Sequence, residues 1–259
     1  MTEAFGNNGM TSNSKLAWVT GASSGIGRAV CLRLVADGWH VAASARSEDK
    51  LAALALEKPG QITAFPLDVT DLAAAKSVAA QIAARLGPID LAIFSAGTYK
   101  KDSARNFDSS ALAETINLNV VGTGHCLEAV IPAMIARRKG HIAVLASVAG
   151  YVGLPGGGFY GASKAALINL CEALYPELER EGVQLTLVNP GFVDTPLTKK
   201  NDFPMPLLIG VDEAAESIVS GLSSNKFEVI FPWKMAVAIK LLHALPNVLR
   251  LMITRKLLR

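Results

Sequence analysis

A tyrosine and a lysine four residues apart form the pair with the clearest potential for chemistry. Tyr160 and Lys164 lie in a segment predicted to be helical. Residues four apart share one helix face, so the phenol and the ammonium group would be neighbours. A free tyrosine has a pKa of ~10, and a nearby cation favours the phenolate and lowers that pKa. We therefore expect Tyr160 to act as a general acid or base at neutral pH, although this spacing is also common on purely structural helices.

Short apolar runs alternate with Ala- and Leu-rich stretches along the chain and would position this pair. The strand candidates are apolar almost throughout, as strands covered by helices on both faces should be. They span residues 16–20, 40–44, 62–67, 91–94, 142–146, 184–188 and 227–231. Helices are predicted at 25–37, 47–57, 71–86, about 111–138, 160–181 and 212–223. This order predicts an α/β fold: one domain over residues 15–232, with a doubly wound parallel sheet of about seven strands and helices on both faces.

A glycine-rich segment joins the first predicted strand to the first predicted helix. Gly21, Gly25 and Gly27 follow the pattern G-x-x-x-G-x-G. Glycines let the backbone turn tightly and approach a pyrophosphate, which then lies at the positive N-terminus of the helix. The pattern departs from the commonest dinucleotide fingerprint. The alternative to a phosphate-binding loop is a tight turn with only a structural role. The strand–loop–helix context favours the phosphate site.

The end of the second predicted strand bears on the choice between NAD and NADP. An acidic residue here would bind the ribose of NAD, whereas an arginine accommodates the 2′-phosphate of NADP. Ala45 occupies the expected acidic position and Arg46 follows it. We therefore predict NADP(H) as the cofactor, and a surface arginine at a strand end is the alternative.

Several motifs together resemble the short-chain dehydrogenase/reductase family over roughly residues 15–231. They are the Thr-Gly-x-x-x-Gly-Ile-Gly loop at 20–27, Ser147 at the end of the fifth predicted strand, Asn119 in Asn-Val-Val-Gly, and the Tyr160/Lys164 pair. The resemblance implies a Rossmann-type fold in which one domain holds both cofactor and catalytic residues. One departure is Phe-Ser-Ala-Gly at 94–97, where the family usually has Asn-Asn-Ala-Gly.

The resemblance implies a catalytic tetrad of Asn119, Ser147, Tyr160 and Lys164, with Asn117 as the alternative asparagine. In the implied reduction, NADPH delivers a hydride to a carbonyl carbon while Tyr160 donates a proton to its oxygen, which Ser147 holds. Lys164 would lower the pKa of the tyrosine and bind the nicotinamide ribose, and Asn119 would hold a water that links Lys164 to solvent. Oxidation of a secondary alcohol would use the same groups in reverse. The alternative is a non-catalytic NADPH-binding sensor or scaffold, but such a protein would be expected to lose tetrad members.

The family comparison also implies further cofactor contacts. Asp68 and Val69 would meet the adenine, and the Pro190-Gly191 turn and Thr195 would embrace the nicotinamide. The full set predicted to bind the cofactor is Gly21, Ser23, Ser24, Gly25, Ile26, Gly27, Arg46, Asp68, Val69, Ala96, Gly97, Asn119, Tyr160, Lys164, Pro190, Gly191, Val193 and Thr195.

Two segments are expected to wall the substrate site. Residues 150–159 and 196–210 are rich in apolar and aromatic side chains, and the first contains three consecutive glycines. We predict a lipophilic ketone or alcohol as the substrate. A lid that merely packs on the core is the alternative.

The net charge of +3 is the sum of two unlike parts. Residues 229–259 carry six cations and no acid, so the rest of the chain has a net charge of −3 and no nucleic-acid partner is expected. Residues 233–259 are predicted to form a basic amphipathic helical tail interrupted at Pro246. Two interpretations stay open: the tail packs on the domain or on a partner subunit, or it contacts a membrane surface.

The remaining features predict where and how the protein works. Residues 1–14 are rich in Gly, Asn, Ser and Thr, without a secretory signal, and are expected to be a flexible leader. Three scattered cysteines predict no disulfide, and four histidines without paired ligand spacing predict no metal. We expect a cytoplasmic protein, peripheral at a membrane if the tail binds one. The family resemblance implies a homodimer or homotetramer formed through the helices at 111–138 and 160–181.

Overall fold

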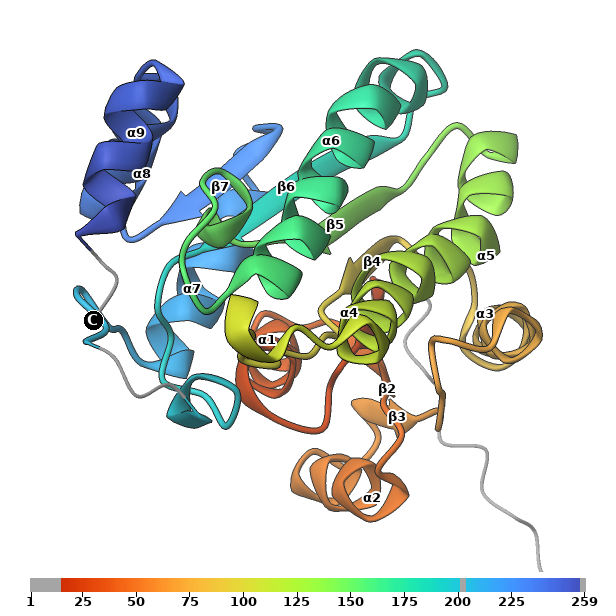
Figure 1. Ribbon diagram of the computed structural model, residues 1–259. Coiled ribbons are helices and arrows are strands. Elements are labelled where there is room, and N and C mark those ends of the chain that lie inside the picture. The colour runs from red at the N-terminus through yellow and green to blue at the C-terminus, as the bar shows by residue number, and fades with distance from the viewer. Residues whose placement is uncertain (1–14, 201–203, 257–259) are drawn as a thin grey trace, which may run out of the picture.

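A sheet of seven parallel strands forms the centre of the computed structural model, which describes residues 15–200 and 204–256 (Figure 1). The predicted leader at 1–14, Phe203 and Arg259 lie outside the described residues. The strand order is β3-β2-β1-β4-β5-β6-β7. The strands are β1 (Leu16–Thr20), β2 (His40–Ser44), β3 (Ile62–Ala64), β4 (Leu91–Phe94), β5 (His141–Leu145), β6 (Gln184–Pro190) and β7 (Glu228–Phe231). The predicted α/β class and doubly wound sheet are confirmed.

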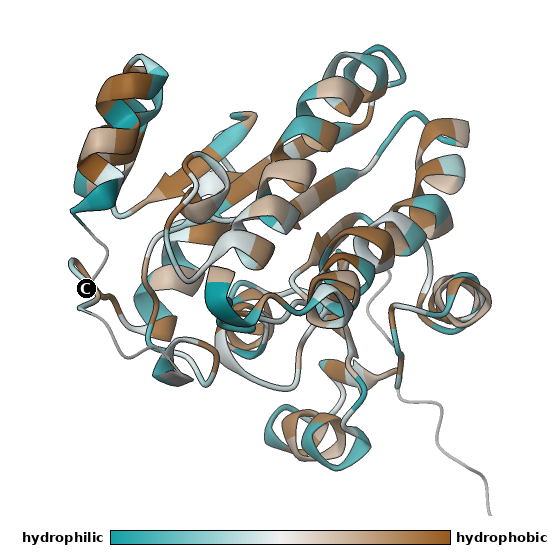
Figure 2. Ribbon diagram, viewed as in Figure 1, coloured by the Kyte–Doolittle hydropathy of each residue, from teal (hydrophilic) through white to brown (hydrophobic). Residues whose placement is uncertain are grey.

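Helices cover both faces of the sheet and bury its apolar strands (Figures 1 and 2). One face packs against α1 (Gly25–Ala36), α2 (Glu48–Glu57) and α7 (Val211–Leu222). The other packs against α3 (Leu72–Leu86), α5 (Gly122–Ala136) and α6 (Gly158–Arg180). Trp18 of β1 is fully buried in this second layer, edge-on to Phe94 at 5.7 Å between ring centroids. The strands lack a polar face because both of their faces are covered.

The strand order reverses between β1 and β4, and this reversal places the site. Chain connections from β1 run outward through β2 to β3, whereas those from β4 run the other way through β5 and β6 to β7. In an open α/β sheet, ligands bind outside the carboxyl ends of the strands at such a reversal. The loops after β1, β4 and β5 meet there.

The long helix predicted at 111–138 differs from the observed one in a functionally important way. It begins earlier, at α4 (Ser109–Ile116), because the Asp108 carboxylate accepts hydrogen bonds from the first helical N–H groups, Ser110 at 2.9 Å and Ala111 at 3.2 Å. A π-helical turn, η2 (Asn117–Val121), then separates α4 from α5. Ser109–Ala136 is the one helical run in the described residues that is long and apolar enough to cross a membrane, and here one side of it packs against the core.

The C-terminal segment forms two helices, as its sequence predicted. α8 (Trp233–Ala244) follows β7 directly, and α9 (Asn247–Arg255) begins after Pro246 (Figure 1). Ile239 anchors α8 to Val148 and Val152 in a small apolar cluster of its own, and Met235 and Leu242 pack against this cluster. Three short 3₁₀ turns complete the described structure: η1 (Ala104–Asn106), η3 (Val148–Gly150) and η4 (Thr198–Lys200).

Candidate active site

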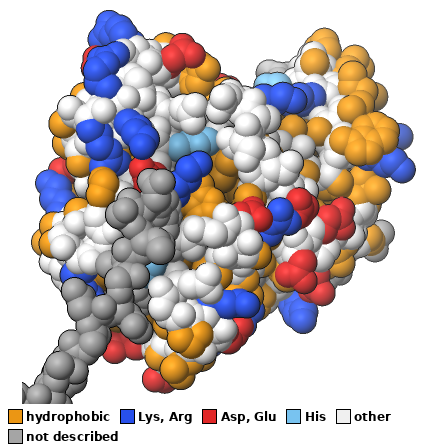
Figure 3. Space-filling view, turned by 180° about the vertical axis from the view of Figure 1, so that it is seen from behind, with side chains coloured by type: hydrophobic (Ala, Val, Ile, Leu, Met, Phe, Trp, Pro, Cys, Tyr) orange, Lys and Arg blue, Asp and Glu red, His pale blue; other side chains and the backbone are white. Residues whose placement is uncertain are grey.

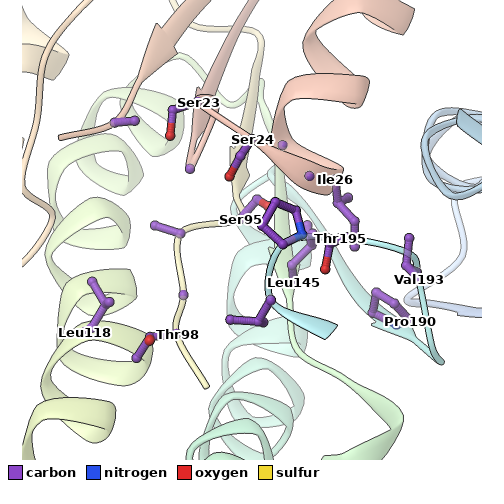
Figure 4. A pocket seen from close by; sticks show the side chains of 18 of the residues that line it. Ser23, Ser24, Ile26, Ser95, Thr98, Leu118, Leu145, Pro190, Val193 and Thr195 are labelled. Carbon is purple, nitrogen blue, oxygen red and sulfur yellow. The ribbon is translucent and has the colours of Figure 1, made fainter. Parts of the chain in front are cut away.

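A cavity of about 390 Å³ lies at the carboxyl ends of the central strands (Figure 4). Ile26 of the glycine loop lies next to Thr195 of the segment after β6, and Leu118 and Thr98 line another side of this space. Every residue predicted to bind the cofactor lines it, except Asn119. Residues that line it without having been predicted are Ala45, Ser47, Leu67, Ser95, Thr98, Leu118, Leu145, Ala146, Pro196, Leu197 and Thr198.

Two glycines of the loop are required by close backbone approaches. Gly21 has φ +69°, and a Cβ there would lie 2.8 Å from the Ala96 nitrogen. A Cβ on Gly27 would lie 2.4 Å from the Gly21 oxygen. Both distances are too short for any side chain, so the loop is folded tightly against the end of β4. This brings α1 up to the cavity.

The N-terminus of α1 is open toward the cavity. The residue before the helix, Ser24, makes no side-chain cap, whereas Asp71 caps α3 by accepting from the Ala74 N–H at 2.9 Å. The first-turn N–H groups of any helix lack internal partners, and together they attract an anion. The residues therefore fit the pyrophosphate of a dinucleotide at this end of the cavity.

Thr20 stabilises the loop in which the family's two asparagines are replaced. Its Oγ1 accepts hydrogen bonds from the N–H groups of Ser95 at 3.2 Å and Ala96 at 3.4 Å. The side chain at the end of β1 thus holds the end of β4 in place. The small Ala96 and Gly97 remain available as a flat wall of the cavity.

Arg46 and Asp68 lie at the far end of the cavity, where the adenosine half of a dinucleotide would be held. The pKa of Asp68 is lowered mainly by the backbone N–H of Thr70, and also by the Thr70 hydroxyl and by the positive charge of Arg46. Arg46 is exposed. Ala45, the position at which an acid would select NAD, is almost buried and carries no charge.

Three of the four predicted catalytic residues meet at the opposite end. Ser147 lies two residues after the end of β5 and hydrogen-bonds Tyr160, which stands in the first turn of α6. One turn further along α6, Lys164 points its ammonium group to the Leu145 carbonyl, with Nζ 2.7 Å from that oxygen. The same Nζ is 5.6 Å from the centre of the Tyr160 ring. The helical spacing thus brings together the groups that it predicted.

The expected direction of the tyrosine pKa shift is wrong for this arrangement. Burial raises the pKa of Tyr160 to about 12, the Ser147 hydrogen bond opposes the shift, and Tyr99 adds to it. Lys164 is not among the groups that shift this pKa. At neutral pH the phenol is therefore protonated, as a proton donor must be.

Lys164 is held in an unusually dry environment for a cation. It is 5% exposed, and burial lowers its pKa to about 8. Close to neutral pH its ammonium group can lose a proton more readily than that of a free lysine.

Asn119 was predicted to contact the cofactor, and the structure places it behind Gly97, outside the lining of the cavity. The side chain is fully buried. Its Oδ1 accepts from the Thr98 N–H at 2.8 Å, and its Nδ2 donates to the Thr98 carbonyl at 3.0 Å and to Ser163 Oγ at 2.9 Å. These bonds tie the loop after β4 to α6. Asn119 therefore positions the neighbouring segments. Its predicted role in holding a water molecule stays a prediction.

Three supporting residues were not found from the sequence. Ser163 Oγ donates to the Tyr160 carbonyl at 2.7 Å while it accepts from Asn119. Asp102 accepts from the Phe159 N–H at 2.6 Å and so holds the start of α6. The Tyr99 ring packs edge-on to Tyr160, with 5.6 Å between ring centroids. Only Ser163 could have been noticed, because it lies inside the Tyr–Lys segment.

Within residues 15–200 and 204–256, no three His, Cys, Asp or Glu side chains gather closely enough to hold a metal ion. The cavity offers instead a helix N-terminus, a phenol, a hydroxyl and a buried amine. That set suits a dinucleotide and an oxygen-bearing substrate.

Comparison with known proteins agrees with this geometry. Residues 15–204 match the short chain dehydrogenase family, and the chain belongs to that family of oxidoreductases, which bind a nicotinamide cofactor. It is 38% identical over 236 residues to an uncharacterized oxidoreductase of Myxococcus xanthus, covering 90% of this chain and 93% of that one. It is 33% identical over 194 residues to the 3-oxoacyl-[acyl-carrier-protein] reductase FabG of Thermotoga maritima, covering 74% and 79%. A variant of actinorhodin polyketide ketoreductase solved with NADPH is 25% identical, with a TM-score of 0.76 over 84% of this chain and 95% of that one.

Proposed function

We propose that the protein interconverts a carbonyl compound and a secondary alcohol with NADP(H), and that Tyr160 is the general acid/base. The observation that carries this is the placement of Tyr160 in one cavity with Ser147, Lys164 and the uncapped N-terminus of α1. A bound reduced nicotinamide supplies the hydride. The reaction class also agrees with the names of two relatives, a 3-oxoacyl reductase and a polyketide ketoreductase.

The chain's own groups handle the substrate oxygen and the proton. Ser147 and Tyr160, which hydrogen-bond each other, can both reach a single carbonyl oxygen held between them. Tyr160 is protonated at neutral pH and donates its proton as negative charge develops on that oxygen. Lys164, with a pKa of about 8, lies beside the phenol and can return a proton to it.

Turnover of ketones in the presence of NADPH tests the reaction class. With a panel of lipophilic ketones and acyl ketones, we expect NADPH oxidation by the native protein and a loss of roughly 100-fold or more in Tyr160→Phe. Tyr175→Phe is the control, since it removes a hydroxyl from the same helix that donates to Glu179 outside the cavity. Full turnover in Tyr160→Phe, or NADPH binding without turnover of any substrate, would favour the non-catalytic sensor instead.

Arg46 and the uncharged Ala45 support NADP(H) over NAD(H). Arg46 borders the cavity beside Asp68, where the 2′-phosphate of NADP would add two negative charges. We expect fluorescence titration to show tighter binding of NADPH than of NADH, and Arg46→Ala to reduce that preference by roughly tenfold. Lys50→Ala, an exposed cation on α2 outside the cavity, should leave it unchanged. Equal binding of the two cofactors by the native protein would contradict the assignment.

A lipophilic substrate is supported by the side chains near the catalytic end. Pro196 and Leu197 line the cavity, and Leu207 and Leu208 are more than 40% exposed in the segment that follows them in the chain. These side chains leave an apolar border on the side where a substrate enters. KM should therefore fall as the alkyl or aryl part of the ketone grows.

We also propose a cytoplasmic homo-oligomer built through α4, α5 and α6, in keeping with the family. Val121, 41% exposed on η2, gives this helical surface an apolar group free to be covered. Light scattering of the native protein should show a dimer or tetramer, and Val121→Glu should reduce its mass.

A further inference from the structure

The C-terminal helices present an apolar surface that the fold does not use. On α8 the exposed residues Trp233, Val237 and Leu241 recur every four positions, at 69%, 51% and 65% exposure. On α9 the exposed large apolar residues are Val248, Leu249, Leu251, Met252 and Ile253. Figure 3 shows hydrophobic side chains gathered over this part of the molecule. We call this set of eight residues the tail surface.

The two helices differ in how much they contribute to the core. α8 buries Ile239 against Val148 of η3 and Val152 of the loop that follows it, and Lys240 pairs with Glu228 of β7. In α9 only Thr254 is buried. Packing on the domain thus explains α8, whereas it leaves the apolar residues of α9 without a role.

The tail helices themselves carry charges of only one sign, and the acid beside them, Glu228 of β7, pairs with Lys240. No acidic residue lies between 229 and 259. Lys234 lies over the Trp233 ring at 5.8 Å, and Arg255 and Lys256 are exposed at the end of α9. Aromatic, leucine and methionine side chains bordered by cations are the composition of a helix that lies in the interface of an anionic bilayer.

The same charges argue against a second copy of the chain as the covering partner. A symmetric contact places a surface against itself, so the cations of one tail would face those of the other without any acid of residues 229–259 to pair with. An anionic membrane instead attracts each Lys or Arg near its surface by about 1 kcal/mol. We propose that α8 and α9 dock this protein on a bilayer containing anionic phospholipid, with the tail surface inserted at the level of the headgroups.

The position of α8 gives this docking a consequence for the site. A Cβ on Gly191, in the turn that borders the cavity, would lie 3.2 Å from Pro232 Cδ and 3.3 Å from Met235 Cγ. His243 Nδ1 is 2.8 Å from the Tyr151 carbonyl, in the loop between Ser147 and Tyr160. A membrane that holds the tail surface would therefore lie beside the substrate side of the cavity.

Sedimentation of the full-length protein with vesicles tests the proposal. We expect binding to mixed phosphatidylcholine–phosphatidylglycerol vesicles, weaker binding to phosphatidylcholine alone, and loss of the difference at high salt. Leu251→Ser/Met252→Ser should lower the partition coefficient at least tenfold. Leu56→Ser on α2, an apolar residue 78% exposed far along the chain, is the matched control and should bind like the native protein.

A second pair of variants separates charge from apolar insertion. Arg255→Gln/Lys256→Gln should lower binding to the mixed vesicles roughly tenfold or more, whereas Lys50→Gln/Lys58→Gln, with equally exposed cations, should not. Unchanged melting temperatures would show that all variants are folded. The proposal is overturned if the native protein does not sediment with mixed vesicles, if the Leu251/Met252 variant binds as well as the native protein, or if light scattering shows that this variant loses subunits, since a second copy would then cover the surface.

Discussion

Helices α6 and α9 depart from the usual distribution of polar and apolar residues in opposite directions. α6 buries polar groups, with Ser163 fully inaccessible and Lys164 5% exposed, whereas α9 exposes Val248, Leu251 and Met252. Buried polar groups and exposed apolar clusters both lower stability unless something compensates for them. In α6 the compensation is visible as hydrogen bonds within the chain. In α9 the compensation has to come from a surface outside the chain. This difference distinguishes α6, which belongs to the catalytic site, from α9, which we propose to be a docking element.

The largest effect is expected when the buried cation of α6 is removed. Lys164→Met should lower kcat/KM by at least roughly 100-fold, because the phenol loses the neighbouring group that returns its proton. Arg255→Met is the matched removal of a cation from α9 and should leave the turnover of a water-soluble ketone unchanged. Steady-state kinetics with NADPH measures both. Equal losses would abolish the distinction between the two helices.

Truncation of one leucine in each helix compares their packing. Leu167 of α6 is 1% exposed, and Leu167→Ala should lower the free energy of unfolding by about 2–5 kcal/mol. Leu251 of α9 is 58% exposed, and Leu251→Ala should change it by no more than about 0.5 kcal/mol. Urea unfolding in the absence of lipid gives both values. A large loss in Leu251→Ala would mean that α9 belongs to the core.

The pH dependence of stability tests whether Lys164 of α6 is a buried cation, in contrast to the exposed cations of α9. The pKa of Lys164 is about 8 in the folded protein and 10.5 as its ordinary value. Between these values the unfolded chain binds more protons than the folded one, so this residue's contribution to stability rises with pH. Below pH 8 both states are protonated and the full cost of burying the charge is present. The rise amounts to at most about 3 kcal/mol.

Other groups titrate in the same range, so the comparison needs a variant. The native protein should gain stability relative to Lys164→Met as pH increases from 8 to 10.5, whereas its difference from Arg255→Met should stay flat. Chemical unfolding at a series of pH values measures this. Parallel curves for the native protein and Lys164→Met would show that Lys164 is not desolvated.

The smallest effect is expected from the hydroxyl that supports the site. Ser163→Ala removes an acceptor for Asn119 and should cost about 1–2 kcal/mol of stability, because part of a buried amide loses its partner. It should also lower kcat more than it changes KM, since Asn119 helps to hold α6. Ser77→Ala on α3 removes an exposed serine that accepts from Gln81, and it should be nearly neutral. Similar losses in both variants would contradict a special role for Ser163.

The strands and the cavity-lining residues were accessible to sequence reasoning because their signals are local. Apolar runs and the glycine spacing each report on a few consecutive residues, and the parallel sheet brings their loops to one edge. Thr20, Gly21 and Gly27 illustrate this, since their contacts all lie at the carboxyl ends of β1 and β4. The Tyr160/Lys164 spacing is local in the same sense.

The remaining features depend on contacts between distant segments. Asn119 bonds Ser163 across 44 residues, and Asp102 bonds Phe159 across 57. Burial of Tyr160, which reverses the expected pKa shift, comes from the packing of several loops and cannot be read from the cation four residues away. The sequence of the tail allows both packing on protein and contact with a membrane. Its amphipathic pattern does not indicate which of its two helices packs on the core.

The π-turn at Asn117–Val121 has a consequence for helical phase. A π-turn holds one residue more than an α-helical turn, so α4 and α5 are offset by one residue, about 100° of rotation. Asn119 bonds Thr98 within this turn, and just after it Gly122 lies so close to Val69 that a Cβ would be 2.7 Å from its Cγ2. Deletion of one residue from the turn would restore a regular helix and rotate one of these contacts out of place. The extra residue therefore acts as a spacer that lets one continuous helical segment contact both the site and the loop after β3.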